Sequence, residues 1–552
     1  MTSGSDPTRR SLSRLLGNHA GNGHSAVSAS RQLVSHSGAE DEGRAWRSTL
    51  DSLAPPSASD NGFRRTPPPA PAHTPAAAGP EEDLRRMLYR EHPELIRRLH
   101  AEAAQALADR RRERDAQAAD PDNTDVTTSF SSTELEQLGT RIAEDVVQRY
   151  IDDTINLGHI APPLAEQHAL VRAVCDNLFR LGPLQPLVDE PDVENILLTG
   201  GSTTVMYGDG SSEQRDHVFE HDDAAIDWVR KLAANAPGGG RPFALSNPAL
   251  RLNLASSDGN NIRLSAVGWA VNRGVSIAIR KHLHKNITLN QLVDMDVMPQ
   301  LLADMLRAAT LAGFSVVASG PMGVGKTTLV RALCAELPIQ TRIGTAELVR
   351  ELYLHELPGR SPYVVSAEVV TGGGERNEWT DQLKGRFDLH QILQEFVSQQ
   401  LDRVIVGEVA GREILALFKA MQMARGSLST VHAYTCRGAI DRLVTLALEE
   451  PGVDETYAIR QVAAHIQIIV QMNTHWIRTV DGKMISRRHI SELAWVEPGE
   501  NARPAVSILY RRLTPDTEPQ WGSLPPTLRD RIDAYGFDTG SWPHFDLDER
   551  VI

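Results

Sequence analysis

The stretch GPMGVGKTT, residues 320–328, fits the pattern G-x-x-x-x-G-K-[ST]. The apolar run FSVVAS before it predicts a buried strand, and TTLVRALCAEL, which overlaps its end, predicts a helix. Glycines in such a loop let backbone N–H groups wrap around phosphates without Cβ clashes, and the N-terminus of the next helix adds partial positive charge. The stretch therefore predicts a phosphate-binding loop in an α/β domain.

This loop supplies candidate ligands for ATP and Mg²⁺. We expect Lys326 to reach the β and γ phosphates, and the Thr327 hydroxyl to ligate Mg²⁺. The remaining predicted nucleotide-binding residues of the loop are Gly320, Met322, Gly323, Val324, Gly325 and Thr328.

Two glutamates are candidates for the acidic groups that such a site needs. Glu408 comes directly after the apolar run Val404–Val406, at a strand end that faces the ligand crevice of a parallel sheet, so it is a candidate Mg²⁺ ligand. Glu347, at the end of another short strand, could act as a base or orient water. Glu351 competes with Glu347 for this role, and spacing alone does not separate them.

A run of small residues, GSLSTVHA at 426–433, ends in His432. Alone, such a histidine is more often a core residue than a functional one. Here it follows the phosphate-binding loop and the Glu408 strand. Small side chains would let a strand pass close to the site and direct His432 at the γ-phosphate.

The composition indicates a multi-domain protein. The chain has 552 residues, 41% of them hydrophobic, and a formal net charge of −14, which does not favour a nucleic-acid coat. Its three cysteines form no metal pattern, which favours a reducing compartment. We find neither a signal peptide nor a membrane-spanning run, so any membrane association is expected to be peripheral.

Changes in composition and hydrophobic pattern along the chain predict five regions. Residues 1–80, rich in Pro, Ser and Ala, predict a disordered tail, and 81–130 a helical segment and linker. An α+β domain is expected over 131–283, a P-loop domain over 284–473, and a C-terminal extension over 474–552. The basic stretch RRMLYREHPELIRRLH, residues 85–100, is either an ordinary solvated helix or a surface that docks on a partner or on anionic lipid.

Together, the loop, the two glutamate boxes and GSLSTVHA resemble the secretion ATPase superfamily of type II and type IV secretion and type IV pili, and most closely its tight-adherence pilus branch. The resemblance covers about Ser131 to Val480 and includes LGPLQPLVDEPDVENILLTG (181–200) and VSIAIRKH (275–282). It implies a RecA-like ATPase domain and a smaller PAS-like α+β domain. It also implies a cytoplasmic homo-hexamer that docks on an inner-membrane platform.

The same resemblance assigns roles to single residues. Glu347 looks like the catalytic glutamate, Glu408 like the Walker B glutamate, and His432 like a sensor of the γ-phosphate. Arg263 and Arg280 match arginines that the family contributes to the nucleotide interface, where a guanidinium would neutralise transition-state charge. A surface salt bridge is the alternative role for both arginines.

Several supporting residues depart from the family pattern. Leu348 follows Glu347 where a second acid is usual, and Ala410 stands in place of an arginine, with Arg412 nearby. The usual T-G-H is replaced by Gln422-Met-Ala424, and R-P-D by Gln400-Leu-Asp402.

Three functions remain open on this basis. The first is a motor for a pilus-like filament or for secretion, with a conjugation-type or effector-secretion ATPase as its close alternative. The second is a nucleotide-binding scaffold that hydrolyses ATP weakly. The third is a nucleic-acid translocase, which the acidic charge disfavours.

Overall fold

The computed structural model describes residues 79–118, 130–235, 242–255, 261–272, 274–283, 286–371, 386–411, 413–480 and 482–543. Except for Gly79 and Pro80, the predicted tail lies outside this range, as does Arg412. Within it, no helix is long and apolar enough to cross a membrane.

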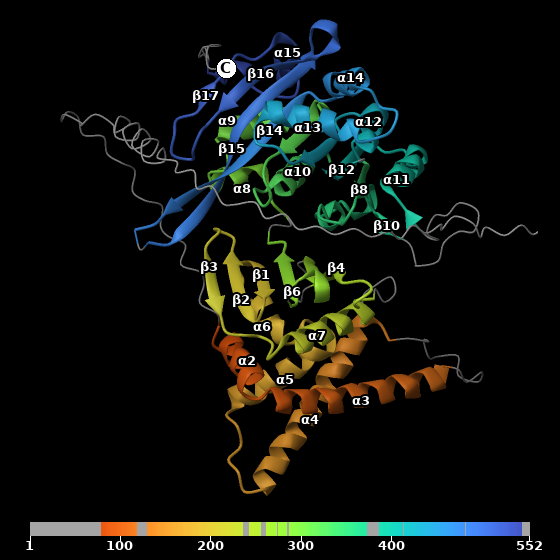
Figure 1. Ribbon diagram of the computed structural model, residues 1–552, viewed down its shortest axis with the longest axis vertical. Helices are drawn as coiled ribbons and strands as arrows, with labels where there is room; N and C mark the ends of the chain where they lie inside the picture. The colour runs from red at the N-terminus through yellow and green to blue at the C-terminus, as the bar shows by residue number, and fades with distance from the viewer. Residues whose placement is uncertain are drawn as a thin grey trace, which may run out of the picture. The chain divides into compact units, whose positions relative to one another are not determined.

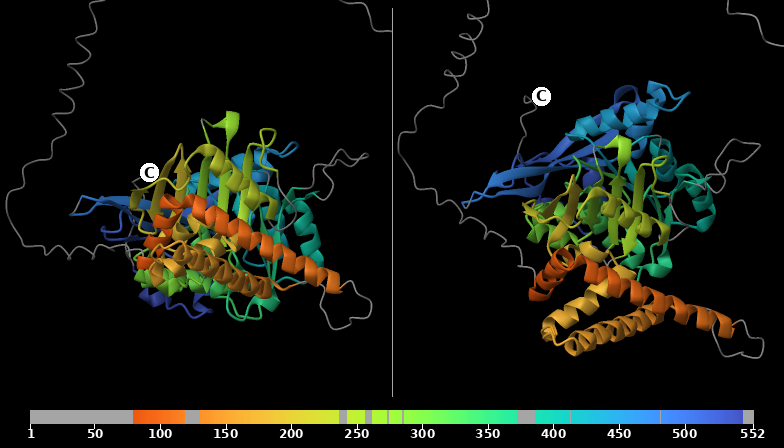
Figure 2. Two further views of the ribbon diagram at one scale, coloured as in Figure 1. Left: turned by 90° about the horizontal axis from the view of Figure 1, so that it is seen from below. Right: turned by 60° about the horizontal axis from the view of Figure 1, so that its bottom comes forward.

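Four helices form a layer of their own (Figure 2). They are α2 (Pro80–Glu91), α3 (Pro93–Ala118), α4 (Ser132–Asn156) and α5 (Leu164–Phe179). Pro93 separates the first two, as its missing N–H predicts. The side chain and backbone of Ser131 exchange hydrogen bonds with Glu134, a capping box that begins α4. One apolar core joins all four helices, with Leu88, Leu99 and Val146 among its buried residues.

The basic stretch 85–100 is only partly solvated. Arg85 is fully buried, and its guanidinium lies 2.8 Å from both Asp176 of α5 and Asp189. Neighbouring Arg86 pairs with Glu190. A buried guanidinium with two carboxylate partners is a structural element, so neither expected surface role applies to Arg85.

A six-stranded antiparallel sheet follows, in the order β3-β2-β1-β6-β5-β4. It comprises β1 (Val193–Thr199), β2 (Ser202–Tyr207), β3 (Ser212–Arg215), β4 (Ala249–Ala255), β5 (Asn261–Val267) and β6 (Ser276–Lys281). The short helix α6 (Gln185–Val188) precedes it, and α7 (Asp222–Asn235) packs in the same core. We call it the N-terminal sheet.

The second sheet has nine strands in the order β17-β16-β15-β14-β7-β13-β12-β8-β9. Its strands are β7 (Val316–Ser319), β8 (Ile343–Glu347), β9 (Val364–Glu368), β12 (Arg403–Val409), β13 (Leu428–Val431), β14 (Ile468–Arg478), β15 (Met484–Pro498), β16 (Pro504–Arg511) and β17 (Gln520–Trp521). The strands from β14 to β9 run parallel, and β15–β17 are added antiparallel. We call it the ATPase sheet. The two-residue strands β10 (Val370–Thr371) and β11 (Arg386–Phe387) pair separately.

Helices cover both faces of the ATPase sheet (Figure 1). One face packs on α8 (Leu289–Asp294), α9 (Gln300–Leu311), α10 (Lys326–Ala335) and α15 (Pro526–Asp533). The other packs on α11 (Leu389–Phe396), α12 (Glu413–Met423), α13 (Cys436–Leu448) and α14 (Glu455–His465). A mixed sheet with a parallel core between two helical layers confirms the expected α/β class. The PAS-like character of the first domain stays a prediction.

Two of the expected domain boundaries fall inside continuous structure. Residue 473 lies within β14, and Trp521 and Trp542 beyond it share the core of α9 and α10. The residues expected to form an extension thus complete the ATPase sheet. Likewise, the helices on either side of residue 130 share one core.

Candidate nucleotide-binding site

Four neighbouring strands bring the predicted site residues to one edge. In β7, β13, β12 and β8, which are parallel and adjacent, the carboxyl ends lie together. Lys326 follows β7 and His432 follows β13, while Glu408 and Glu347 lie near the ends of β12 and β8. This is the edge where open α/β sheets bind ligands.

The phosphate-binding loop has the backbone that its glycines permit. Gly323 and Gly325 have φ values of 79° and 96°, and α10 begins immediately afterwards at Lys326. At Gly320 a Cβ would lie 2.5 Å from the Met472 carbonyl oxygen, so β14 presses directly on the loop. The other predicted loop residues vary in exposure: Val324 is buried, Thr327 and Thr328 are half-buried in the first turn of α10, and Met322 is exposed.

Lys326, His432 and Glu408 form a chain of polar contacts. Lys326 Nζ donates to the carbonyl oxygens of Gly320 (2.9 Å) and Pro321 (2.7 Å) and lies 3.2 Å from His432 Nδ1. On the other side of the ring, His432 Nε2 is 2.9 Å from Glu408 Oε1. An ammonium can only donate a hydrogen bond, so Nδ1 accepts one from Lys326, and the Nε2–H group donates one to Glu408 Oε1. His432 is therefore oriented from both sides, and with 38% of its side chain exposed it is not a core residue.

Burial lowers the pKa of Lys326 to about 8; the charge of Glu408 opposes this shift and that of Arg280 adds to it. The positive charge of Arg280 thus disfavours the charged form of Lys326. A desolvated ammonium that shares its donors with backbone carbonyls is ready to exchange them for phosphate oxygens.

Glu347 is almost fully buried, with an exposed fraction of 2%. Its Oε1 accepts the backbone N–H groups of Glu351 and Leu352, each at 2.9 Å, whereas Oε2 has no hydrogen-bond partner. Burial raises the pKa of Glu347 to about 7, against the effect of the two N–H donors and of the neighbouring Thr345 hydroxyl. Gly407 makes room for it, since a Cβ there would lie 2.9 Å from Glu347 Cγ. A buried carboxyl with one oxygen unpaired and a pKa near neutrality has the properties of a general base.

The N-terminal sheet supplies both predicted arginines. Arg263 of β5 and Arg280 of β6 are direct partners in the antiparallel register. Arg263 pairs with Glu351, while Arg280 has Glu194 of its own sheet at 3.7 Å. The structure therefore separates the two glutamates that spacing could not: Glu351 holds an arginine and Glu347 is the buried carboxyl.

Sequence patterns missed the polar contacts that join the N-terminal sheet to the P-loop domain. Asn261 donates to Glu356 at 3.0 Å, and Asn253 donates to Glu368 at 3.4 Å. Each pair is separated by about a hundred residues, so no local signal identifies it.

The geometry also limits which residues could bind Mg²⁺. In the described parts of the chain, no group of three or more His, Cys, Asp or Glu side chains could hold a metal ion. Mg²⁺ usually keeps several waters and binds through one or two protein oxygens plus substrate phosphates. The half-buried Thr327 and the Glu408 carboxylate, 43% exposed, fit that limited set.

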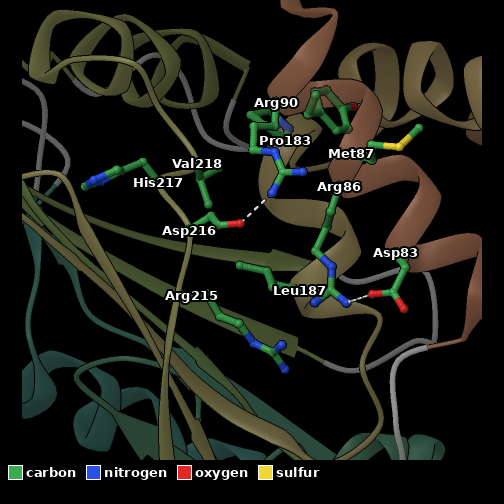
Figure 3. Close-up of a pocket in the computed structure, with 11 residues that line it drawn as sticks. Asp83, Arg86, Met87, Arg90, Pro183, Leu187, Arg215, Asp216, His217 and Val218 are labelled. Atoms are coloured by element: carbon green, nitrogen blue, oxygen red, sulfur yellow. Dashed lines mark hydrogen bonds and ion pairs between the residues drawn. The ribbon is translucent and has the colours of Figure 1, made fainter.

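A separate pocket of about 310 Å³ lies between α2 and the end of β3 (Figure 3). None of the site residues above lines it. Its arginines already have acidic partners: Arg86 pairs with Asp83 and Glu190, and Arg90 with Asp216. We therefore place the candidate site at the edge of the ATPase sheet, where the phosphate-binding loop lies.

Residues 247–487 match the family described as Type II/IV secretion system protein. This match agrees with the secretion ATPase family that the motifs resemble. The tight-adherence branch stays a prediction.

Related proteins come from several bacteria. A Mycobacterium tuberculosis protein named for an inferred role in conjugal transfer is 26% identical over 66% of this chain and 98% of its own length. Type IV secretion system protein VirB11 of Brucella suis is 26% identical over 63% of this chain and 97% of its own length. The crystal structure of the Brucella suis VirB11 ATPase in complex with sulphate aligns with 22% identity and a TM-score of 0.28, covering 59% of this chain and 96% of that one.

Proposed function

We propose that this protein is a hexameric ATPase motor that powers assembly of a tight-adherence type IV-like pilus or secretion across the cytoplasmic membrane. The observation that carries the proposal is the convergence of Lys326, His432, Glu408 and Glu347 at one sheet edge, with Arg263 and Arg280 contributed by a second sheet. A site built from two sheets can couple nucleotide state to their relative position. Its expected place is the cytoplasmic face of the membrane, on a platform protein.

In this proposal ATP binds at the loop through its phosphates. Lys326 exchanges its carbonyl partners for β and γ phosphate oxygens. Because Lys326 also contacts His432, its movement alters the hydrogen bond to that residue. Glu347 accepts a proton from the attacking water at its unpaired Oε2, while Arg280 and Arg263 stabilise charge on the transferring group. Thr327 and Glu408 are the groups that would hold Mg²⁺, and the ion would supply positive charge against the phosphates.

ATP turnover by purified full-length protein tests the enzyme. Lys326→Ala and Glu408→Gln should lower turnover by about 100-fold or more, because each removes a charged group from the phosphate site. Turnover in the wild type no higher than in these variants, with and without membranes that carry the platform, would contradict the motor. Native mass measurement with and without ATP tests for the hexamer.

A type IV secretion ATPase is the second candidate. Alignment over 97% of VirB11 and 98% of the mycobacterial relative favours it. Genes for pilin-like proteins beside this one would favour the pilus, and genes for conjugation components would favour secretion. A weakly hydrolysing scaffold is the outcome that remains if nucleotide binds without turnover.

A further inference from the structure

The strands β14 and β15 form a long two-stranded arm (Figure 1). Its residue Arg488 contacts Glu194 of the N-terminal sheet. Arg488 of this arm donates from Nη2 to Glu194 Oε2 at 2.8 Å, while the other oxygen, Oε1, lies 3.7 Å from Arg280 Nη2. The Glu194 side chain is only 12% exposed. One nearly buried carboxylate thus lies between an arginine of the arm and an arginine of the nucleotide site.

A second contact fixes the arm at this place. The Ser486 N–H donates to the Asp209 carbonyl oxygen at 2.8 Å, in the turn between β2 and β3. The next residue, Gly210, has a φ of 80°, and a Cβ there would lie 2.0 Å from Ser486 Oγ. Both backbone conformation and space require glycine, so the arm docks through a fitted contact that sets the position of Arg488.

Glu194 contacts two arginines, and the strength of its pairing with Arg488 determines whether Arg280 is available to the nucleotide. Arg488 makes the hydrogen-bonded ion pair, whereas Arg280 is beyond hydrogen-bond distance and remains 41% exposed. Without Arg488, a nearly buried carboxylate would lose its closer partner. Because an unpaired buried charge is costly, Glu194 would then draw in Arg280, the other cation that pairs with it in the described chain.

We propose that Arg488 is a positioning residue for the nucleotide site: by holding Glu194, it leaves Arg280 free to bind the terminal phosphate of ATP. The proposal rests on the proposed function. It gives the C-terminal strands a part in nucleotide recognition, since the arm belongs to the ATPase sheet and Glu194 to the N-terminal sheet.

The test compares the affinities of the full-length protein for ADP and for the slowly hydrolysed analogue ATPγS. Arg280 would contribute mainly to the terminal phosphate, so Arg488→Ala should lower the preference for ATPγS over ADP about fivefold. A general loss of structure would weaken both ligands together. The double variant Arg488→Ala with Glu194→Gln should recover the preference to within about twofold of the wild type, as should Arg488→Lys alone.

Arg487→Ala is the matched control, because Arg487 pairs with Asp296 and Asp516, outside the N-terminal sheet. Its preference should stay within about twofold of the wild type. An unchanged preference in Arg488→Ala, or a loss that Glu194→Gln does not repair, would overturn the proposal. If none of the proteins hydrolyses ATP but the preferences change as expected, the motor is contradicted and the positioning role is supported.

Discussion

The two sheets that meet at the nucleotide site hold their functional groups in different ways. In the ATPase sheet, Lys326 and Glu347 are buried and fixed by backbone carbonyl and N–H groups. In the N-terminal sheet, Arg263 and Arg280 are 30% and 41% exposed and held by carboxylates that could exchange partners. We call the first the rigid half, because backbone groups fix its side chains, and the second the adjustable half, because its arginines are held by ion pairs that could exchange.

The largest expected effect falls on the rigid half. Glu347→Gln keeps the size of the side chain but removes the base, so turnover should fall about 10²- to 10⁴-fold. Measured kcat under saturating ATP checks this, with Glu351→Gln as the matched control, because its backbone N–H to Glu347 is retained. Similar losses in both variants would contradict the assignment of Glu347 as the base.

The same substitution should change stability with pH. The pKa of Glu347 is raised from 4.5 to about 7 in the folded protein, so the folded state binds the proton more tightly than the unfolded state does. The wild type should therefore lose stability as pH rises from about 4.5 to 7, by up to about 3 kcal/mol. Glu347→Gln should lack this loss, and urea unfolding at pH 5 and pH 8 measures it. Parallel pH profiles for the two proteins would show that Glu347 is not the buried titrating group.

An intermediate effect is expected in the adjustable half. Arg280→Ala should lower turnover about tenfold and Arg263→Ala by less, because Arg263 is already paired with Glu351. Steady-state kinetics of both variants measures the two losses of turnover and shows which arginine contributes more. If the Arg280→Ala protein is as active as the wild type, Arg280 has no part in catalysis and forms only a surface salt bridge.

The smallest expected effect concerns the ion pair between the halves. Glu351→Gln frees Arg263 and should tighten ATP binding no more than about threefold, since a partly exposed pair contributes about 0–1 kcal/mol. Raising the salt concentration should reduce the difference from the wild type, because it screens the same pair. A titration of nucleotide affinity at two ionic strengths checks this, and a difference that grows with salt would contradict it.

Local patterns in the sequence mark the residues of the rigid half, whereas the arginines of the adjustable half follow only from the resemblance to a family. The phosphate-binding loop, the strand before Glu408 and the run that ends in His432 are local patterns, and the sheet brings them together because carboxyl ends of parallel strands share an edge. Glu351 and Arg263 lie 88 residues apart, and their pairing depends on how two sheets meet. No periodicity records such a contact.

The C-terminal strands show the same limit on a larger scale. Their polar, turn-rich sequence predicts a C-terminal extension outside the P-loop domain. Instead, β15–β17 join the ATPase sheet through pairings that depend on β14. Arg85 is a further case, since a helical pattern cannot show that one arginine of a basic stretch is enclosed with Asp176.

The contact between Gly320 and the Met472 carbonyl oxygen has a practical consequence for anyone dissecting this protein. A fragment trimmed at residue 473 would keep every motif by which the enzyme is recognised, yet it would cut β14, the strand that lies beside β7 under the phosphate loop. Such a fragment would expose the apolar residues that Trp495 and Tyr510 now cover. Its inactivity would therefore be a result of folding, and would say nothing about catalysis.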